Sequence, residues 1–386
     1  MQLNHFALLA ALGNAAIAAP ESETPWSIRM ATSIMSRKQG IMTGKGGASE
    51  LLQAGFVQRA LTRLGEQYPG RAAVQSKRYV RDSALSVAPF VLNASHDASG
   101  YPLDRLSNGI AMLTIAESHK DVNGTQASEL KTAVEALRKS IDLNRRNLFG
   151  GLWYYVYPDL SYLDGMFSLL PFTTFYSLNQ AHGSSDVNIT ALIDMQTQMR
   201  LLRQHTRNST TGLLVHGYDA SKKAVWANPK TGASPFVWGR SLGWFTMALV
   251  DTIELIRLTP KPLSISAASL SIELQVFFRE LAPAVASSVD STTGGWWQIV
   301  DQPGREKNYI ESSASAMFAY SLLKGARLGL LDHADVSNAK RIGVRAHKYL
   351  TDTFIVQNQN GTLGWNGTVA VCSLNSTASY DVSLHA

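Results

Sequence analysis

Aromatic side chains are concentrated in the stretches of sequence that separate candidate helices. Residues 153–157 contain a tryptophan and three tyrosines, Trp226 and Trp238 follow further along, and Trp296 and Trp297 are adjacent. Exposed aromatic rings present flat apolar faces that pack on sugar rings, while their N–H and O–H groups still find partners. Single rings of this kind also fill gaps between helices. A cluster on successive loops, however, favours a carbohydrate-binding cleft.

Charged and polar residues near these rings suggest what such a cleft would bind. The planar guanidinium of Arg240 can bind both oxygens of a carboxylate, although an arginine there can also fix a loop to a backbone carbonyl. The sequence has no G-x-S-x-G, no H-E-x-x-H and no metal-ligand spacing among its nine histidines. We therefore expect neither a metal nor an organic cofactor.

The elements that must position these residues are mostly helical. Apolar residues recur at helical spacing over 57–64, 130–141 and 245–256, and Thr259-Pro260 ends the last of these stretches. Strand-like alternation is scarce. The pattern predicts an all-α fold in a single domain over residues 20–386, with long loops. The expected loops, rich in Gly, Pro and Asn, span residues 93–102, 147–158, 208–235, 288–308 and 358–368.

The composition is that of an ordinary globular protein, with 386 residues, 45% of them hydrophobic and 17% charged. No apolar run approaches the roughly 18 residues that span a bilayer, so we expect no membrane partner. The net charge of +6 suits anionic partners, but no Lys/Arg cluster indicates nucleic acid. The lone Cys372 forms no intramolecular disulfide, and we expect a monomer whose stability comes from a packed core.

Residues 1–19 resemble a secretory signal peptide. An apolar stretch over 6–12 leads to Ala16-Ile17-Ala18 and Pro20, although the usual positive charge before it is missing. The alternative is a first helix of the fold. Seven N-x-[ST] sequons agree with export, so we predict a secreted, extracellular protein.

Three segments in order resemble a known enzyme family. They are YLDGMF at 162–167, HGYD at 216–219 with WGRSLGW at 238–244, and GWWQ at 295–298 with NYIESSASAM at 308–317. Together they are similar to the unsaturated rhamnogalacturonyl hydrolases, glycoside hydrolase family 105, in the form of a secreted fungal-type member. The resemblance covers approximately residues 45–380.

This resemblance implies an (α/α)6 toroid of six helical hairpins with its active site at one end. The implied reaction removes a terminal 4,5-unsaturated uronic acid from pectin-derived rhamnogalacturonan oligosaccharides. An acid protonates C4 of the C4=C5 double bond, water adds at C5, and the resulting hemiketal opens and expels the rest of the chain. The reaction needs no metal or organic cofactor and differs from the usual two-carboxylate schemes.

The resemblance assigns two catalytic carboxylates. Asp164 is the implied general acid/base, which must hold a proton near working pH, and apolar neighbours or a second carboxylate favour that state. Asp104 is the implied second aspartate of the same pocket. Each also has a plainer interpretation, Asp164 as a helix N-cap and Asp104 as a cap paired with Arg105. Glu311 is explained by its place at a helix N-terminus and is not included in the catalytic set.

Five further residues are implied to bind substrate. Arg240 is the implied partner of the uronate carboxylate, Trp238 and Trp244 wall its ring, and ordinary packing explains Trp244 better than Trp238. His216 is expected to bind substrate hydroxyls or position water. Tyr162 stands where relatives often have tryptophan and borders the site for the leaving sugar.

Two departures from the family pattern leave alternatives open. The rings at 153–157 and Tyr162 allow galactose or another uronide in place of rhamnose as the leaving group. The sequence ends at Ala386, where relatives continue, so we expect the last helix of the toroid to be missing and the chain to be less stable than longer relatives. The alternative functions are an unsaturated glucuronyl hydrolase acting on other uronides and an inactive carbohydrate-binding relative.

Overall fold

Helices account for most of the structure, as the apolar periodicity predicts. The computed structural model describes residues 24–47, 49–118, 122–179, 186–260, 262–369 and 374. The α-helices are α1 (Trp26–Ser36), α2 (Glu50–Gln67), α3 (Arg71–Val87), α4 (Ala94–Gly100), α5 (Gly109–Ser118), α6 (Gly124–Asp142), α7 (Met166–Asn179), α8 (Asp186–Thr206), α9 (Gly239–Leu258), α10 (Ile265–Ser287), α11 (Ser312–Arg327) and α12 (His333–Phe354). Shorter elements are the 3-10 helices η1 (Ala88–Phe90) and η2 (Leu103–Asn108) and the strands β1 (Leu160–Tyr162), β2 (Gly217–Asp219), β3 (Ile355–Gln357) and β4 (Leu363–Trp365).

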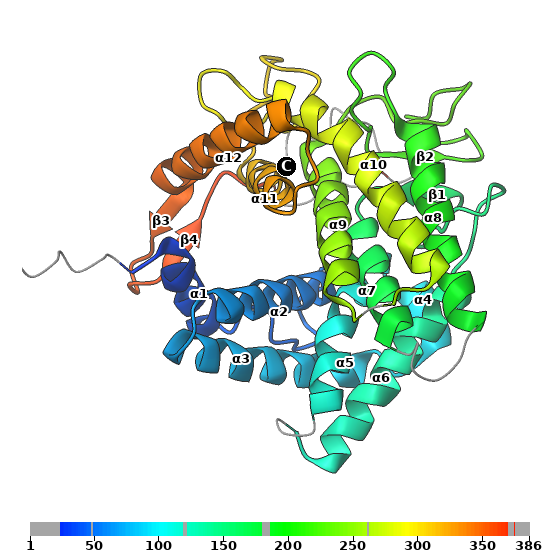
Figure 1. The fold of residues 1–386 in the computed structure, drawn as a ribbon, viewed down its shortest axis with the longest axis vertical. Coiled ribbons are helices and arrows are strands. Elements are labelled where there is room, and N and C mark those ends of the chain that lie inside the picture. The colour runs from blue at the N-terminus through cyan, green and yellow to red at the C-terminus, as the bar shows by residue number, and fades with distance from the viewer. Residues whose placement is uncertain are drawn as a thin grey trace, which may run out of the picture.

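The helices are arranged around a ring (Figure 1). Consecutive helices pack as pairs: α2 with α3, α5 with α6, α7 with α8, α9 with α10, and α11 with α12. The inner wall is a series of elements in contact, which runs from α2 through the 3-10 helix η2 to α7, α9 and α11. The second members form an outer layer, with α8 against α10 and α10 against α12. The predicted all-α, (α/α)6 fold class is confirmed.

The first helix of the described chain packs against its last hairpin on one side of the ring. Figure 1 shows α1 beside the β3–β4 hairpin. The Arg37 Nη1 donates to the Leu363 carbonyl at 2.6 Å, and the Leu363 amide donates to Ser33 Oγ at 2.9 Å. The predicted signal peptide, residues 1–19, and the chain beyond residue 374, where we expect a missing last helix, lie outside the described residues.

The predicted apolar faces are buried where the periodicity places them. On α9, Phe245, Leu249 and Ile253 are all within 1% of complete burial, and the helix ends at Leu258, just before the predicted stop. The prediction of a loop over 93–102 is wrong, because α4 occupies most of it. Asn93 caps this short helix by accepting a hydrogen bond from the amide of its third residue.

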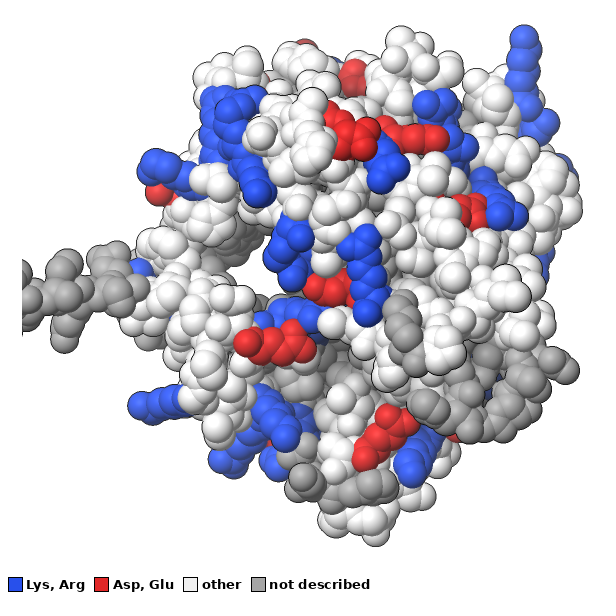
Figure 2. Space-filling view, viewed as in Figure 1, with Lys and Arg blue, Asp and Glu red and all other residues white. Residues whose placement is uncertain are grey.

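A buried cluster of charges joins the inner helices α2, α9 and α11. Lys324 Nζ lies 2.5 Å from Asp251 Oδ1 and 2.7 Å from Glu254 Oε2. Arg63 and Arg59 of α2 also belong to the cluster, at 2.5 Å from Glu254 and 3.2 Å from Asp251 respectively, and Arg327 pairs with Glu254 at 2.6 Å. Charges removed from water are tolerated when they are paired in this way. On the face of the molecule drawn in Figure 2, positively and negatively charged side chains lie close together, with no broad surface of one sign.

Candidate active site

A two-stranded sheet brings Asp164 and His216 together. Strand β1 pairs antiparallel with β2, with Tyr162 opposite Gly217. The contact extends beyond the strands, because the Leu163 amide donates to the His216 carbonyl at 3.1 Å. A side chain on Gly217 would bring its Cβ to 2.5 Å from a carbonyl oxygen of β1, so only glycine allows this close approach. The sheet therefore holds Asp164, two residues before α7, close to His216, the residue before β2.

The carboxylate of Asp164 is held on one of its two oxygens. Oδ2 lies 3.0 Å from His216 Nε2 and accepts the Ser241 hydroxyl at 2.5 Å. Ser241, in the first turn of α9, is fully buried, whereas 13% of the Asp164 side chain is exposed. Oδ1 takes no hydrogen bond from the described part of the chain. The carboxylate therefore turns away from α7, whose first turn it does not cap with its side chain, and presents Oδ1 as the available atom.

Asp104 is the more deeply buried of the two predicted carboxylates. It lies in η2, is only 5% exposed, and accepts the Tyr154 hydroxyl at 2.8 Å on Oδ2. The amide of Leu103 donates to the Tyr154 carbonyl at 2.9 Å, which ties η2 to the loop that carries the tyrosine. Burial, and secondly the charge of Asp164, raise the pKa of Asp104 from 3.8 to about 7 against the opposing effects of the Tyr154 hydrogen bond and Arg105.

Arg105 does not hold Asp104 by a salt bridge. Its guanidinium is fully buried and donates from Nε to Ser140 Oγ at 2.9 Å and from Nη2 to Asn144 Oδ1 at 3.1 Å. Further bonds go to backbone carbonyls. Burial lowers the pKa of Arg105 to about 10. Asp104 is therefore not a carboxylate held simply by an ion pair with Arg105.

Rings from three of the segments between helices gather beside the two carboxylates. The Tyr162 ring lies 5.0 Å from Tyr154 and 5.1 Å from the His216 ring, measured between centroids, and His216 lies 4.8 Å from Trp238. We call the whole set the aromatic cluster. It consists of the buried residues Leu160, Tyr162, Ala224, Trp226, Trp238, Ile299, Val369 and Leu374, with Tyr154, Tyr157, Ala227, Phe236 and Tyr309 packed against them.

Two of the tryptophans are in other surroundings. Trp244 packs on Phe167 at 4.6 Å, in a separate apolar group with Met247 and Met317, which matches the packing interpretation given above. Trp296 is completely buried in the main core, and its Nε1 donates to the Val285 carbonyl at 2.8 Å. Its expected place in a sugar-binding cleft is wrong, because the ring fills the space between helices.

Arg240 combines the two interpretations made from the sequence. Its Nη2 donates to the carbonyl of Val369, and its guanidinium lies over the Trp238 ring, 5.1 Å from the centroid. The Nε of Arg240 and the Nε1 of Trp238 are buried, and neither has an acceptor among the described residues. Buried donors are nearly always paired, so two unpaired donors at one place require an explanation. An anionic ligand would supply the missing acceptors.

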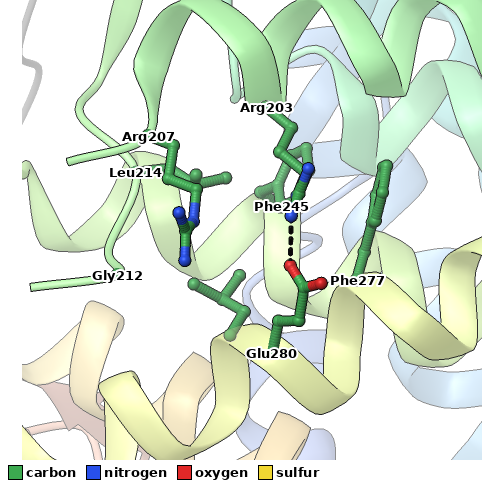
Figure 3. A pocket seen from close by; sticks show the side chains of 8 residues that line it. Arg203, Arg207, Gly212, Leu214, Phe245, Phe277 and Glu280 are labelled. Carbon is green, nitrogen blue, oxygen red and sulfur yellow. Dashed lines mark hydrogen bonds and ion pairs between the residues drawn. The ribbon is translucent and has the colours of Figure 1, made fainter. Parts of the chain in front are cut away.

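A small pocket elsewhere has no connection with these residues. It has a volume of about 20 Å³ and lies where α8, α10 and the loop after α8 meet (Figure 3). Its lining consists of Arg203, Arg207, Gly212, Leu214, Phe245, Phe277, Glu280 and Leu281. Arg203 and Glu280 form an ion pair across it. None of the predicted site residues contributes to this pocket.

The sequence analysis missed two residues of the candidate site. Ser241 stands beside Arg240 in the WGRSLGW motif, but a serine in a helix gives no signal of its own. Tyr154 was noticed only as a ring, and its hydroxyl bond to Asp104 depends on the folded loop. Within the described residues, no three or more His, Cys, Asp and Glu side chains gather as metal ligands. No helix in this part of the chain is long and apolar enough to span a membrane.

Comparison with known proteins agrees with a carbohydrate-active enzyme. Residues 73–383 match the model of glycosyl hydrolase family 88. The chain belongs to glycosyl hydrolase family 88.

Individual proteins are similar to this chain in sequence or in fold. A solved glycoside hydrolase of family 105 from Clostridium acetobutylicum is 27% identical, with a TM-score of 0.72 over 94% of this chain and 93% of that one. The unsaturated glucuronyl hydrolase of Bacillus sp. GL1, described as responsible for glycosaminoglycan degradation, shares the fold at 11% identity, with a TM-score of 0.54 over 89% and 87% of the chains. Protein Atu3128 of Agrobacterium fabrum is 39% identical over 163 residues, which is 42% of this chain and 66% of that protein. The match thus spans just under two thirds of that relative.

Proposed function

We propose that this glycoside hydrolase releases a terminal 4,5-unsaturated uronic acid from rhamnogalacturonan oligosaccharides by hydrating the C4=C5 double bond. The observation that carries the proposal is the carboxylate pair, in which Asp104 is buried and Asp164 is held on one oxygen by His216 and Ser241. Burial and mutual repulsion let such a pair retain one proton near neutral pH. A retained proton is what the first step of the hydration needs.

In the proposed reaction, Asp164 delivers this proton through Oδ1 to C4 of the unsaturated uronate. Water then adds at C5, and the proton lost from water returns to the carboxylate pair. The hemiketal at C5 opens and the remaining sugar chain leaves. His216 and Ser241 keep Oδ2 fixed during the transfer, so the distance from Oδ1 to C4 is set by the protein rather than by side-chain rotation.

The substrate carboxylate is proposed to bind Arg240. The unpaired Nε of Arg240 and Nε1 of Trp238 support this, because a carboxylate oxygen would accept from both. The Tyr162 and Trp238 rings are proposed to pack on the sugar. The leaving rhamnose is proposed to lie against the tyrosines of the 147–158 loop, which join the aromatic cluster from one side.

Export from the cell is part of the same proposal, because a pectin fragment is an extracellular polymer product. The predicted signal peptide over residues 1–19 supports it. So do the exposed sequon asparagines Asn93, Asn123, Asn360 and Asn366, which lie at the surface where a glycan could be attached.

The test follows the ultraviolet absorbance of the conjugated C4=C5 bond during incubation with unsaturated galacturonyl-rhamnose. We expect the absorbance to fall, Asp164→Asn to slow the fall by about 10²–10⁴-fold, and the rate to decline as pH rises through about 7. The decline follows because the pair loses its shared proton as the raised pKa of Asp104 is passed. Turnover of an unsaturated glucuronyl disaccharide alone would reassign the substrate. Absence of turnover on both, from a folded chain that binds them, would identify an inactive binding relative.

A further inference from the structure

Glu311 is a buried carboxylate at the start of α11. It is completely inaccessible, and its Oε2 accepts from the Ala314 amide at 2.6 Å as an N-cap. Both oxygens also lie within 2.9 Å of the Ser313 hydroxyl. Ser, Thr, Asp and Asn are the side chains that normally serve as N-caps. The longer glutamate therefore has a reach that capping alone does not require.

The longer Glu311 side chain also contacts residues 366–369, which we call the strap. Glu311 Oε1 accepts from the Val369 amide at 3.1 Å. The strap is also fixed to α11 through Ser312, whose amide donates to the Gly367 carbonyl at 2.9 Å and whose hydroxyl donates to the Asn366 carbonyl at 2.7 Å. The position of Val369 is thus set from the N-terminus of α11.

Val369 in turn holds Arg240 by a hydrogen bond. Its carbonyl, on the opposite side of the residue from its amide, accepts from Arg240 Nη2. Val369 is 1% exposed and packs in the aromatic cluster with Trp238, over whose ring the guanidinium lies. One strap residue therefore lies between a buried anion, Glu311, and the arginine proposed to bind the substrate carboxylate.

We propose that Glu311 is a positioning residue for Arg240, acting through Val369, and so determines the preference for a charged uronate. The inference rests on the proposed function. The negative charge of Glu311 fixes the Val369 amide, and the Val369 carbonyl then fixes Nη2 of Arg240. With Nη2 occupied, the buried and unpaired Nε is the guanidinium atom that is proposed to donate to the substrate carboxylate. Glu311 itself touches no reacting atom.

The kinetic test compares Glu311→Gln with the unchanged protein on unsaturated galacturonyl-rhamnose and on its methyl ester. The glutamine oxygen can still cap Ala314, but its amide group then meets the Val369 N–H, donor against donor. We expect KM for the free acid to rise about tenfold, the size of one hydrogen bond to a charged group, with kcat within about twofold. KM for the ester should change by less than about twofold, because the ester has no charge for Arg240 to bind. Equal effects on acid and ester would overturn the proposal.

The matched control is Asp290→Asn. Asp290 also ties a loop, accepting from the Thr293 amide and hydroxyl at 2.7 Å, but it bonds neither the strap nor Arg240. It should leave the acid-to-ester ratio of KM unchanged. If Asp290→Asn changes this ratio as much as Glu311→Gln does, the effect comes from a general loosening of loops, and the proposed role of Glu311 is overturned.

Hydrogen exchange tests the link without any activity. In Glu311→Gln the peptide containing Val369 should exchange at least about tenfold faster, and the start of α11 should stay protected because its cap remains. Unchanged exchange at Val369 would overturn the proposal. If the exchange changes as expected but the unchanged protein turns over no unsaturated uronyl substrate, the link stands and it is the proposed function that fails.

Discussion

Replacing Asp104 by asparagine should stabilise the protein, and should do so more strongly at high pH. The carboxyl is buried, and its pKa in the folded chain is about 7, against an ordinary value of 3.8. The folded state therefore binds this proton more tightly than the unfolded state. A raised carboxyl pKa gives stability that is complete below the unfolded value and is lost as pH rises through the folded value.

The size of the effect follows from the two values. A difference of about three units corresponds to about 4 kcal/mol of unfolding free energy lost on going from low to high pH. About 2–3 kcal/mol of this falls between about pH 5 and about pH 8, because part of the loss has already occurred at the lower pH. Asp104→Asn removes the titration, and its amide oxygen can still accept the Tyr154 hydroxyl. The difference in unfolding free energy between the variant and the unchanged protein should therefore be about 2–3 kcal/mol larger, in favour of the variant, at about pH 8 than at about pH 5.

Urea unfolding of both proteins at about pH 5 and about pH 8 measures this difference. Asp352→Asn is a suitable control, because Asp352 is exposed on α12 and pairs only with Lys348 in the described chain. A difference between Asp104→Asn and the unchanged protein that stays the same at both pH values would refute the reasoning. It would mean that Asp104 ionises equally in the folded and unfolded states. Activity should nevertheless be lost in the variant, because an asparagine amide cannot retain the proton that the proposed hydration needs.

Two further predictions concern the hydrogen bond to Asp164 and the buried charge cluster. Ser241→Ala should lower kcat by about 10-fold with KM within about twofold, because Asp164 Oδ2 loses a donor but no substrate contact is removed; a raised KM at constant kcat in steady-state assays would contradict this. Lys324→Met should lower the unfolding free energy by about 3–5 kcal/mol in urea at neutral pH, because Asp251 and Glu254 lose their shared cation. Since neighbouring cations hold the pKa of Asp251 below its usual value, the loss should shrink as pH falls through that range.

The helices could be predicted from the sequence because each long one buries a continuous apolar face. The face of α9 and its end at Leu258 are examples. The short helix α4 was missed because seven residues are too few for apolar periodicity to emerge, and the Asn93 cap looks the same as a turn residue. Trp296 was misassigned for a related reason. A ring in a loop has the same sequence signal whether it faces a sugar or the core.

The candidate site was predictable only in part. The motifs identify Asp164, His216 and Arg240. The contact of Asp164 with His216, however, depends on two strands of three residues each, which are too short to show the alternation of apolar and polar residues that predicts a strand. Whether Arg240 binds a carboxylate or a backbone carbonyl could not be decided from its residue type. In the folded chain one nitrogen of its guanidinium serves the Val369 carbonyl and another is left unpaired. The roles of the predicted site residues remain predictions until the variants are measured.

The difference between the two carboxylates follows from where the ring places them. The inner helices α7, α9 and α11 all begin at the site, with Asp164 just before α7, Ser241 in the first turn of α9 and Glu311 capping α11. Free amides and the helix dipole at such ends favour the negative charge of a bound uronate. Asp104 instead lies in the short η2, where burial is the largest influence and favours the proton. The helix N-termini therefore favour an anionic substrate, and the burial of Asp104 favours a proton in the carboxylate pair from which Asp164 is proposed to protonate that substrate.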